Sequence, residues 1–477
     1  MEQDLWLGLD LGTTGVKCIA YDDDVRPVAS SETESPPDYL PDGIVEQDPE
    51  VWWQSALQVM QDVLAKVDPG LVRGISISSQ GITIVPVDAT GLARRPAISW
   101  LDARGQAMLA RLAERIPPDE VEGRTGKSFR VGYSLALLAW LAEREPESLA
   151  PGATVLMPMD YLVSKLTGTA VTDQTMASGS MYYNLARRDW DDDILAAAGV
   201  SRQILPPVRP AGTAAGSLLP EVVQRLGLAP DVVVAVGGQD QKCAAYGAGL
   251  DETTMTLSLG TSAALSAPHV APGPPSDGFG VFAHVVPGQW IREAAILTAG
   301  AANRWFASVL GTSDFAALSA QAAAGHPAES GPFFFPHLSR TERGSWPVAP
   351  GGVFWGLGLD AERADLVRAV MEGVAFEIGL ACPPALATAM PGRIRLFGGG
   401  VRSPLWCQMI ADATGTRVEA LSDPQMAAAG AARLARRAAG RPEAPPAVVG
   451  ASYEPTERGS VRTRAEAYRQ LRDLIYR

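Results

Sequence analysis

Apolar and polar residues alternate with period two in two stretches of the chain, and each stretch leads into a Gly-Thr pair. Positions 5–9 alternate before Gly12-Thr13, and positions 255–259 alternate before Gly260-Thr261. Such alternation predicts strands buried on one face, and a Gly-Thr pair between two β-rich runs predicts a tight hairpin. A hairpin that occurs twice, once in each half, favours two similar domains.

The remaining pattern alternates strands with helices in both halves. Asp48 and Pro49 are typical of a helix N-cap and first helical turn. Strands are predicted at 73–79, 83–87, 232–236 and 394–397, and 168–216 is predicted to be rich in turns. Helices are predicted at 49–67, 101–115, 133–145, 158–166, 240–247, 300–310, 314–323, 361–386, 403–413, 425–438 and 462–476. This alternation predicts an α/β fold, with domains at 1–248 and 249–477.

Length and composition narrow the class of protein. The 477 residues exceed what one hydrophobic core usually organises, and 47% hydrophobic with 19% charged residues is typical of a globular protein. The net charge of −13, with no dense run of Lys or Arg, argues against nucleic acid and anionic membranes as partners. No apolar stretch approaches the ~20 residues of a membrane span, and the acidic start predicts no signal peptide. Four scattered cysteines predict reduced thiols and a cytoplasmic location.

The two hairpins are candidate phosphate sites. Glycine allows close approach of the backbone, and successive turn amides with hydroxyls form a nest for an anion. Gly12, Thr13 and Thr14 supply these groups in the first copy, and Gly260 and Thr261 supply them in the second. Two such nests predict domains that bind a polyphosphate from opposite sides.

Asp10 stands beside the first nest, where a carboxylate would repel phosphate unless a divalent cation lay between them. Mg²⁺ favours one or two carboxylates together with water and phosphate oxygens. The second copy has Ser258 at the matching position, so the metal is expected in the N-terminal half only. The alternative is that Asp10 hydrogen-bonds its own turn.

Asp240 follows a β-branched run and a Gly-Gly pair, at the start of a predicted helix. Ligands collect at the carboxyl ends of strands in α/β sheets. A carboxylate there could accept the proton of a hydroxyl that attacks a γ-phosphate. Helix N-capping explains the same position equally well.

Other catalytic signatures find little support. Gly398–Gly400 joins a predicted strand to a predicted helix and could admit a nucleoside or phosphate, although such glycine turns are common. No Walker A loop, Rossmann fingerprint, His-based metal pair or G-x-S-x-G nucleophile elbow is present.

The ordered motifs together resemble the FGGY family of carbohydrate kinases, within the actin and hexokinase ATPase superfamily. They lie at 10–17, 100–104, 237–241, 258–263, 352–357, 372–377 and 397–403. The resemblance spans essentially the whole chain. It implies two ribonuclease H-like domains with a cleft between them, the first for sugar and the first phosphate hairpin, the second for the other hairpin and adenosine.

The resemblance also implies roles for individual residues. Asp240 matches the catalytic base and Asp10 the Mg²⁺ site. Residues matching the ATP site are Gly12, Thr13, Thr14, Lys17, Gly260, Thr261, Gly300, Asn303, Arg304, Gly399, Gly400 and Ser403. Residues matching the sugar site are Glu46, Gln47, Gln80, Trp100, Asp102, Arg104, Asp240 and Gln241, while Asp48 is expected mainly to cap its helix.

The chain departs from the family pattern at two places. Xylulokinases usually carry Met-His-Gly against the ketose, whereas this chain reads Ser79-Gln80-Gly81-Ile82-Thr83, and Ala136 stands where a lysine is usual. We therefore expect an ATP-dependent kinase for a terminal hydroxyl of a small sugar. A pentulose such as xylulose is favoured, and erythritol, glycerol, ribulose or gluconate are alternatives.

The rival hypothesis is a non-catalytic regulator that binds sugar or ATP. Related repressors carry an N-terminal helix-turn-helix and a Cys-rich zinc motif, and the sequence has neither. A homodimer is the default assembly to expect.

Overall fold

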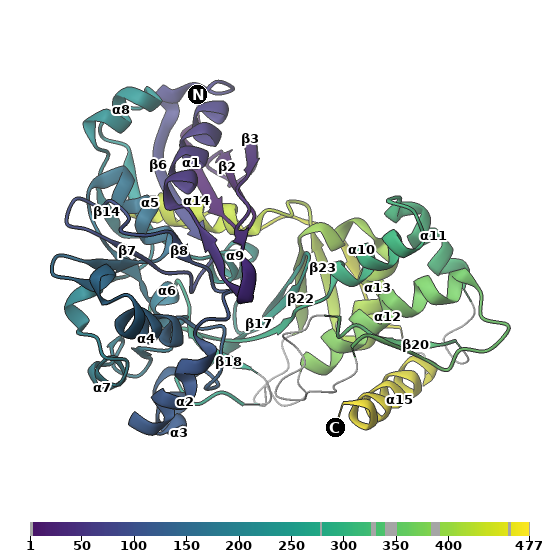
Figure 1. Ribbon diagram of the computed structural model, residues 1–477. Helices are drawn as coiled ribbons and strands as arrows, with labels where there is room; N and C mark the ends of the chain where they lie inside the picture. The colour runs from purple at the N-terminus through teal and green to yellow at the C-terminus, as the bar shows by residue number, and fades with distance from the viewer. Residues whose placement is uncertain are drawn as a thin grey trace. The chain divides into compact units, whose positions relative to one another are not determined.

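The chain forms two compact units in the computed structural model, which describes residues 3–276, 279–325, 331–338, 351–382, 392–456 and 459–476. The first unit consists of Met1–Gly247, His269–Arg292 and Gln425–Pro446, and the second of Ala248–Pro268, Glu293–Pro424 and Ala447–Arg477 (Figure 1). The assignment of sugar, phosphate and adenosine binding to domains 1–248 and 249–477 stays a prediction.

The first unit is built on a mixed sheet of six strands. Its order is β14 (Ala214–Ser217), β15 (Val233–Gln239), β6 (Val72–Ser79), β1 (Leu5–Leu11), β2 (Gly15–Tyr21) and β3 (Pro27–Glu34). The predicted hairpin is confirmed, because β1 pairs antiparallel with β2. Strands β15, β6 and β1 pair in parallel, so their carboxyl ends lie at one edge of the sheet.

Helices cover both faces of this sheet. α1 (Pro49–Leu64) and α5 (Pro158–Thr167) contact each other, and α1 packs on β2 and β3 while α5 packs on β6 and β15. α14 (Met426–Ala438), close to the C-terminus in sequence, packs on β1, β6 and β15 (Figure 1, yellow). A side chain at Gly8 would meet the backbone of α14, whereas Leu7 and Leu9 belong to the core shared with α1. Alternation along β1 therefore places α14 and α1 on opposite faces.

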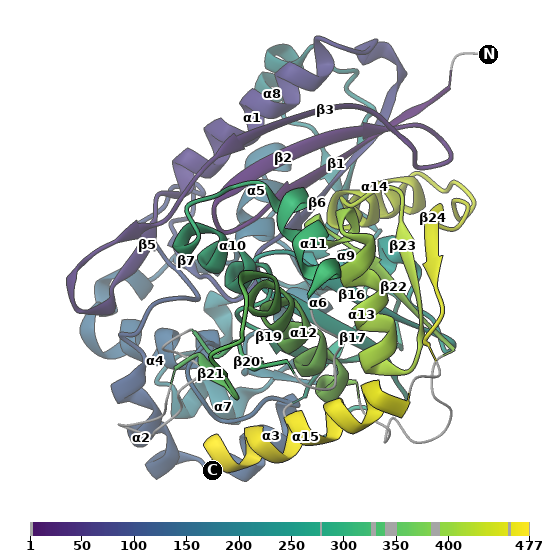
Figure 2. The same ribbon diagram turned by 90° about the vertical axis from the view of Figure 1, so that its right-hand side faces the viewer.

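The second unit repeats this plan. Neighbouring strands of its sheet include, in this order, β19 (Trp290–Ile296), β17 (Ala263–His269), β16 (Thr254–Leu259), β22 (Arg393–Phe397), β23 (Arg417–Leu421) and β24 (Val449–Tyr453). β16 pairs antiparallel with β17 and parallel with β22, as β1 does with β2 and β6. The helices are α10 (Gly300–Val309), α11 (Phe315–Ala324), α12 (Arg363–Ala381), α13 (Pro404–Thr414) and α15 (Gly459–Ile475). α12 and α13 lie side by side (Figure 2).

Several predicted elements differ from the observed ones. The helix expected from 101 begins only at Gln106 (α2, Gln106–Arg115), because 99–104 forms a loop fixed by the carboxylate of Asp102. The segment 168–216 contains the short helices α6 (Gln174–Ser178) and α7 (Asp192–Ala197), each capped by an aspartate. The helix expected over 361–386 ends at Ala381, and 383–386 lie outside the described residues. Asp48 caps α1 as predicted, accepting from the Glu50 amide at 2.9 Å.

Within the described ranges, none of the helices combines the length and the apolar character that crossing a membrane would need.

α9 (Asp240–Ala248) crosses α14 at two glycines. A Cβ at Gly430 would lie 1.9 Å from the carbonyl oxygen of Cys243, and one at Gly247 would lie 2.3 Å from that of Met426. Both contacts are with backbone, which cannot rotate away. The position of α9, and of Asp240 at its start, therefore depends on small residues at this crossing.

We predict that Gly430→Ala lowers the free energy of unfolding by about 1–3 kcal/mol or more, because the added methyl overpacks two backbones. Gly123→Ala is the matched control, since Gly123 also lies in a helix, α3 (Pro118–Thr125), but a Cβ there has no neighbour within 4 Å. That control should be neutral or stabilising, as alanine favours helix. Urea unfolding of both variants measures the difference, and equal effects would contradict the prediction.

Candidate active site

Three polar residues lie at the carboxyl edge of the first unit's sheet. Asp10 stands near the end of β1, Gln80 directly follows β6, and Asp240 directly follows β15. The register pairs Asp10 with Ser78 and Gln239 with Ser79, so the three strand ends are level. Ligands in α/β proteins bind at this edge of a parallel sheet.

The first Gly-Thr hairpin is closed by its own backbone and anchored by two distant side chains. The Gly12 amide donates to the Gly15 carbonyl at 2.9 Å. Trp100 Nε1 donates to Thr13 Oγ1 at 3.1 Å, and Gln47 Nε2 donates to the Thr13 carbonyl at 3.0 Å. Two residues expected at the sugar site thus hold the predicted phosphate hairpin.

Asp10 is half-buried at the edge of this hairpin. Its Oδ1 accepts from Ser78 Oγ at 3.0 Å, on the neighbouring strand. Burial raises the pKa of Asp10 to about 6, opposed by the Ser78 hydrogen bond and the charge of Lys17. Lys17 faces Asp10 across β1 and β2 and forms an ion pair with Glu32 at 2.8 Å.

A half-buried carboxylate beside a candidate phosphate nest suits a hard cation. No cluster of three or more His, Cys, Asp or Glu that could bind a metal occurs among the residues described. An ion at Asp10 would therefore complete its shell with phosphate oxygens and water, as Mg²⁺ does in nucleotide sites. The residues present fit the predicted Mg²⁺.

Asp240 begins α9, and its carboxylate is oriented by its two chain neighbours. Oδ1 accepts from the Gln241 amide at 2.7 Å and from Gln239 Nε2. Gln239 was not anticipated from the sequence, although its place beside Asp240 in the Gly-Gly-Gln-Asp turn was a usable signal. With Oδ1 fixed by two donors, the carboxylate plane has a defined direction.

Gln80 and Gln47 form a buried amide relay that ends on the hairpin. They are 2% and 3% exposed, and Gln80 Nε2 donates to Gln47 Oε1 at 2.8 Å. Gln47 Nε2 in turn donates to the carbonyls of Thr13 and Ser35. Because carbonyl oxygens only accept, the direction of both amides is fixed.

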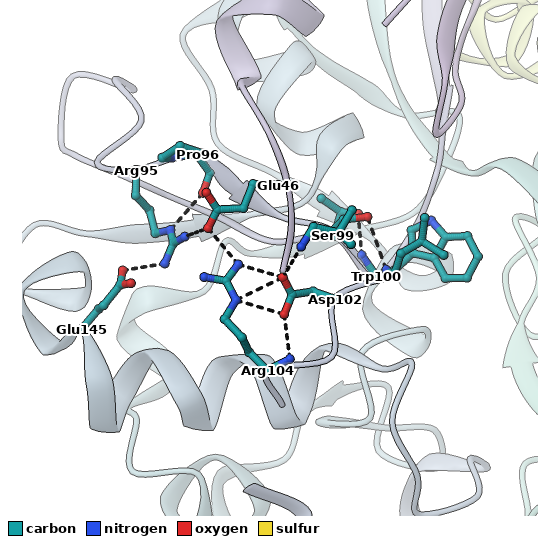
Figure 3. A network of polar contacts seen from close by, with 11 residues as sticks. Glu46, Arg95, Pro96, Ser99, Trp100, Asp102, Arg104 and Glu145 are labelled. Atoms are coloured by element: carbon teal, nitrogen blue, oxygen red, sulfur yellow. Dashed lines mark hydrogen bonds and ion pairs between the residues drawn. The ribbon is translucent and has the colours of Figure 1, made fainter. Parts of the chain in front are cut away.

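The loop that carries Trp100 is held by a network of charges (Figure 3). Arg104 bonds Asp102 through Nε at 3.0 Å and through Nη2 at 2.8 Å, and it pairs with Glu46 at 2.8 Å. Arg95 pairs with Glu46 and with Glu145 (Figure 3). Glu46, Asp102 and Arg104, expected near the sugar, are thus bonded to one another.

The network is completed by contacts that the sequence did not indicate. Trp140 lies under the guanidinium of Arg104, with Cζ 4.8 Å from the ring centroid. Asp102 Oδ2 also accepts from the Val45 amide at 2.7 Å. Arg95, Glu145 and Trp140 lie outside the recognised motifs, so only their three-dimensional proximity identifies them.

The second hairpin is supported by the start of α10 in the second unit. The amides of Gly300 and Ala301 donate to the carbonyls of Gly260 and Thr261 at 3.0 and 2.9 Å. A Cβ at Gly300 would lie 2.3 Å from the Gly260 oxygen, so only glycine fits there. Arg304 Nη2 donates to Thr261 Oγ1 at 2.7 Å. Asn303 lies on the same helix, half-buried.

The glycine turn after β22 lies beside this hairpin. A side chain at Gly400 would collide with that of Leu259, the last residue of β16, at 2.3 Å. Gly399 begins a short 3₁₀ turn, and Ser403 caps α13 and contacts Ser319 Oγ at 2.9 Å. The structure therefore brings the second hairpin and the 399–403 turn to one edge of the second unit's sheet.

Two family models match the chain. The N-terminal domain of the FGGY family of carbohydrate kinases matches residues 5–247, and the C-terminal domain of that family matches 255–439. Xylulose kinase of Escherichia coli is 35% identical, over 91% of this chain and 90% of that protein. Glycerol kinase of Gloeobacter violaceus is 31% identical, over 87% and 84%. A crystal structure of a xylulose kinase from Brucella ovis, 30% identical, superposes with a TM-score of 0.89 over 98% of both chains. The predicted family and fold class are confirmed.

We predict that Glu46→Gln destabilises the first unit, because Glu46 is the carboxylate shared by Arg95 and Arg104. All three side chains are at most 16% exposed, and losing hydrogen bonds between buried charged groups costs about 1–3 kcal/mol. Glu143→Gln is the matched control, since Glu143 pairs with an arginine on the exposed surface. Glu143→Gln should lower the free energy of unfolding by less, and added salt should reduce that effect further. Urea unfolding at low and high salt compares them, and equal losses would contradict the prediction.

Proposed function

The chain belongs to the FGGY family of carbohydrate kinases, and on this premise we propose that it phosphorylates a terminal hydroxyl of a pentulose such as xylulose. ATP is the phosphoryl donor, as in the family. The observation that carries the proposal is the level placement of Asp10, Gln80 and Asp240 at one sheet edge, with the Gly12-Thr13 hairpin beside them. The relatives named xylulose kinase support the pentulose.

In the proposed mechanism Asp240 is the general base. The sugar oxygen attacks the γ-phosphorus, its proton passes to the Asp240 carboxylate, and the bond from phosphorus to the β,γ-bridging oxygen breaks to release ADP. The bonds from Gln239 and Gln241 orient this carboxylate before the sugar arrives. General-base catalysis of this kind contributes about 10²–10⁴-fold to the rate.

The phosphates are assigned to the two hairpins. Gly12, Thr13, Thr14 and Lys17 form the first nest, and Gly260 and Thr261 the second, while Gly300, Asn303, Gly399, Gly400 and Ser403 border adenosine. Asp10 would hold Mg²⁺, which would neutralise charge on the phosphates. The sugar would be bordered by Gln47, Gln80, Trp100 and Gln241, with the Glu46, Asp102 and Arg104 network supporting that wall. The expected homodimer and cytoplasmic location stay predictions.

A polyol kinase is the second candidate, because glycerol kinase of Gloeobacter violaceus is 31% identical. ADP release measured over a panel of four- to seven-carbon ketoses, polyols and aldonates separates the candidates. Strict dependence on one pentulose supports the proposal, and turnover on glycerol alone would replace it.

We predict that Asp240→Asn lowers kcat by at least ~10²-fold, because the amide cannot accept the hydroxyl proton. ATP affinity should stay within about threefold of the wild type, since the substitution leaves both phosphate hairpins intact. Asp251→Asn is the control, because Asp251 lies on an exposed turn where it bonds Thr253. Coupled ADP release and nucleotide titration measure the two effects. Near wild-type turnover on the best substrate would rule out Asp240 as the base.

We further predict that Asp10→Asn raises the Mg²⁺ concentration for half-maximal rate at least ~10-fold, since a neutral amide binds a hard cation more weakly than a carboxylate does. Asp88→Asn, at an exposed turn, should leave it unchanged. Rates measured across a Mg²⁺ titration at saturating ATP test this, and an unchanged Mg²⁺ requirement in Asp10→Asn would place the metal elsewhere.

A further inference from the structure

Gln239 is held rigidly at the end of β15. Its backbone amide donates to Thr175 Oγ1 at 2.8 Å, and that hydroxyl donates to the buried carboxylate of Asp173 at 2.8 Å. A Cβ at Gly81 would lie 2.7 Å from Gln239 Cγ. The glutamine side chain therefore occupies the space that the missing side chain of Gly81 leaves, beside the turn that follows β6.

The orientation of the Gln239 amide follows from its partner. Nε2 donates to Asp240 Oδ1, and because an ionised carboxylate only accepts, the nitrogen must face Asp240. Oε1 therefore faces away from that carboxylate. It is buried and has no hydrogen-bond partner in the described part of the chain.

A second unpartnered acceptor ends the neighbouring strand. Gln80 Nε2 donates to Gln47 Oε1. Gln80 Oε1 is buried and has no hydrogen-bond donor among the described residues. β15 and β6 pair Gln239 with Ser79, the residue before Gln80. The side-chain amides of Gln239 and Gln80 therefore belong to neighbouring positions on adjacent strands. Buried polar atoms are normally hydrogen-bonded, and exceptions at a site call for a ligand or water.

We infer that Gln239 is a positioning and specificity-determining residue: Nε2 orients the base, and Oε1 accepts from the hydroxyl on the carbon next to the one that is phosphorylated. This rests on the proposed function. Oε1 belongs to the same side-chain amide as the nitrogen that holds the base. When one hydroxyl of a terminal 1,2-diol reaches Asp240, its neighbour comes within reach of Oε1. Gln80 Oε1 accepts from a further hydroxyl.

The same acceptors select against sugar acids. Amide oxygens and the Asp240 carboxylate present negative potential, which repels a substrate carboxylate, whereas hydroxyls donate to them. The two arginines of the network around Trp100, Arg95 and Arg104, are paired with Glu46, Asp102 and Glu145. The site thus favours a neutral polyhydroxylated acceptor that carries a terminal 1,2-diol.

The test compares the best sugar with its deoxy analogue, which lacks only the hydroxyl next to the phosphorylated one. A site built to bond a hydroxyl rejects the analogue strongly, so the wild type should prefer the parent at least ~100-fold in kcat/KM. Gln239→Met should lower kcat/KM for the parent at least ~30-fold and reduce the preference to about threefold or less. Gln321→Met, at another buried unpartnered amide oxygen on α11 of the second unit, should keep the wild-type preference.

Gln239→Glu separates the two roles and answers the question if Gln239→Met does not fold. It keeps an acceptor but loses the donor to Asp240, so kcat should fall at least ~10-fold while the preference for the diol survives. Retained preference in Gln239→Met, or unchanged kcat in Gln239→Glu, would overturn the inference while leaving a working kinase. Absence of phosphorylation of any sugar by the wild type would instead contradict the proposed function.

Discussion

Parallel pairing of β15, β6 and β1 is the constraint on which the site depends. In parallel strands the carboxyl ends share one edge, so Asp10, Gln80 and Asp240 lie at the same edge without any long-range arrangement of loops. The pairing of β15 with β6 is interrupted between Ala235 and Gly238 of β15. A Cβ at Gly237 would lie 1.7 Å from the Ile77 carbonyl, so the irregularity requires glycine. Bulges re-aim the side chains that follow them, and here those are Gln239 and Asp240.

The second unit has the same strand pairing as the first, but it carries a serine where the first unit has Asp10. β16, β17 and β22 reproduce the relation of β1, β2 and β6, and the hairpin after β16 is supported by Gly300 as the first hairpin is supported by Gln47 and Trp100. Ser258 replaces the half-buried carboxylate of Asp10. Loss of solvent disfavours the charged form of Asp10 and raises its pKa to about 6. A cation can neutralise a carboxylate at such a position, so the asymmetry supports one metal for the two proposed nests.

Sequence reasoning succeeded where a local signal was strong. Periodicity and caps located α1, α5, α12, α13 and α14 to within a few residues, and the Gly-Thr hairpins and Asp240 lie on the elements predicted. The helix predicted from 101 begins only at Gln106, because Asp102 fixes the preceding loop by bonding Arg104 and the amide of Val45, which lies in a distant segment. The roles of Glu46 and Gln47 were equally hidden: Glu46 bridges two arginines, and Gln47 bonds the hairpin.

Three locally unfavourable features lie at the strand ends that carry the site. Ile82 has φ 76°, a left-handed conformation that is rare for a β-branched residue, and its carbonyl is bonded by Ser134 Oγ at 2.7 Å. Such strain costs of order 1–3 kcal/mol. Gln80, in the turn after β6, and Gln239, at the end of β15, each have a buried side-chain oxygen without a partner among the described residues. A sequence optimised for stability alone would relieve all three features with glycine at 82 and apolar side chains at 80 and 239. Their coincidence beside Asp240 means that the folded protein holds acceptors in place before a donor arrives, which is the condition for recognising hydroxyls without reorganisation.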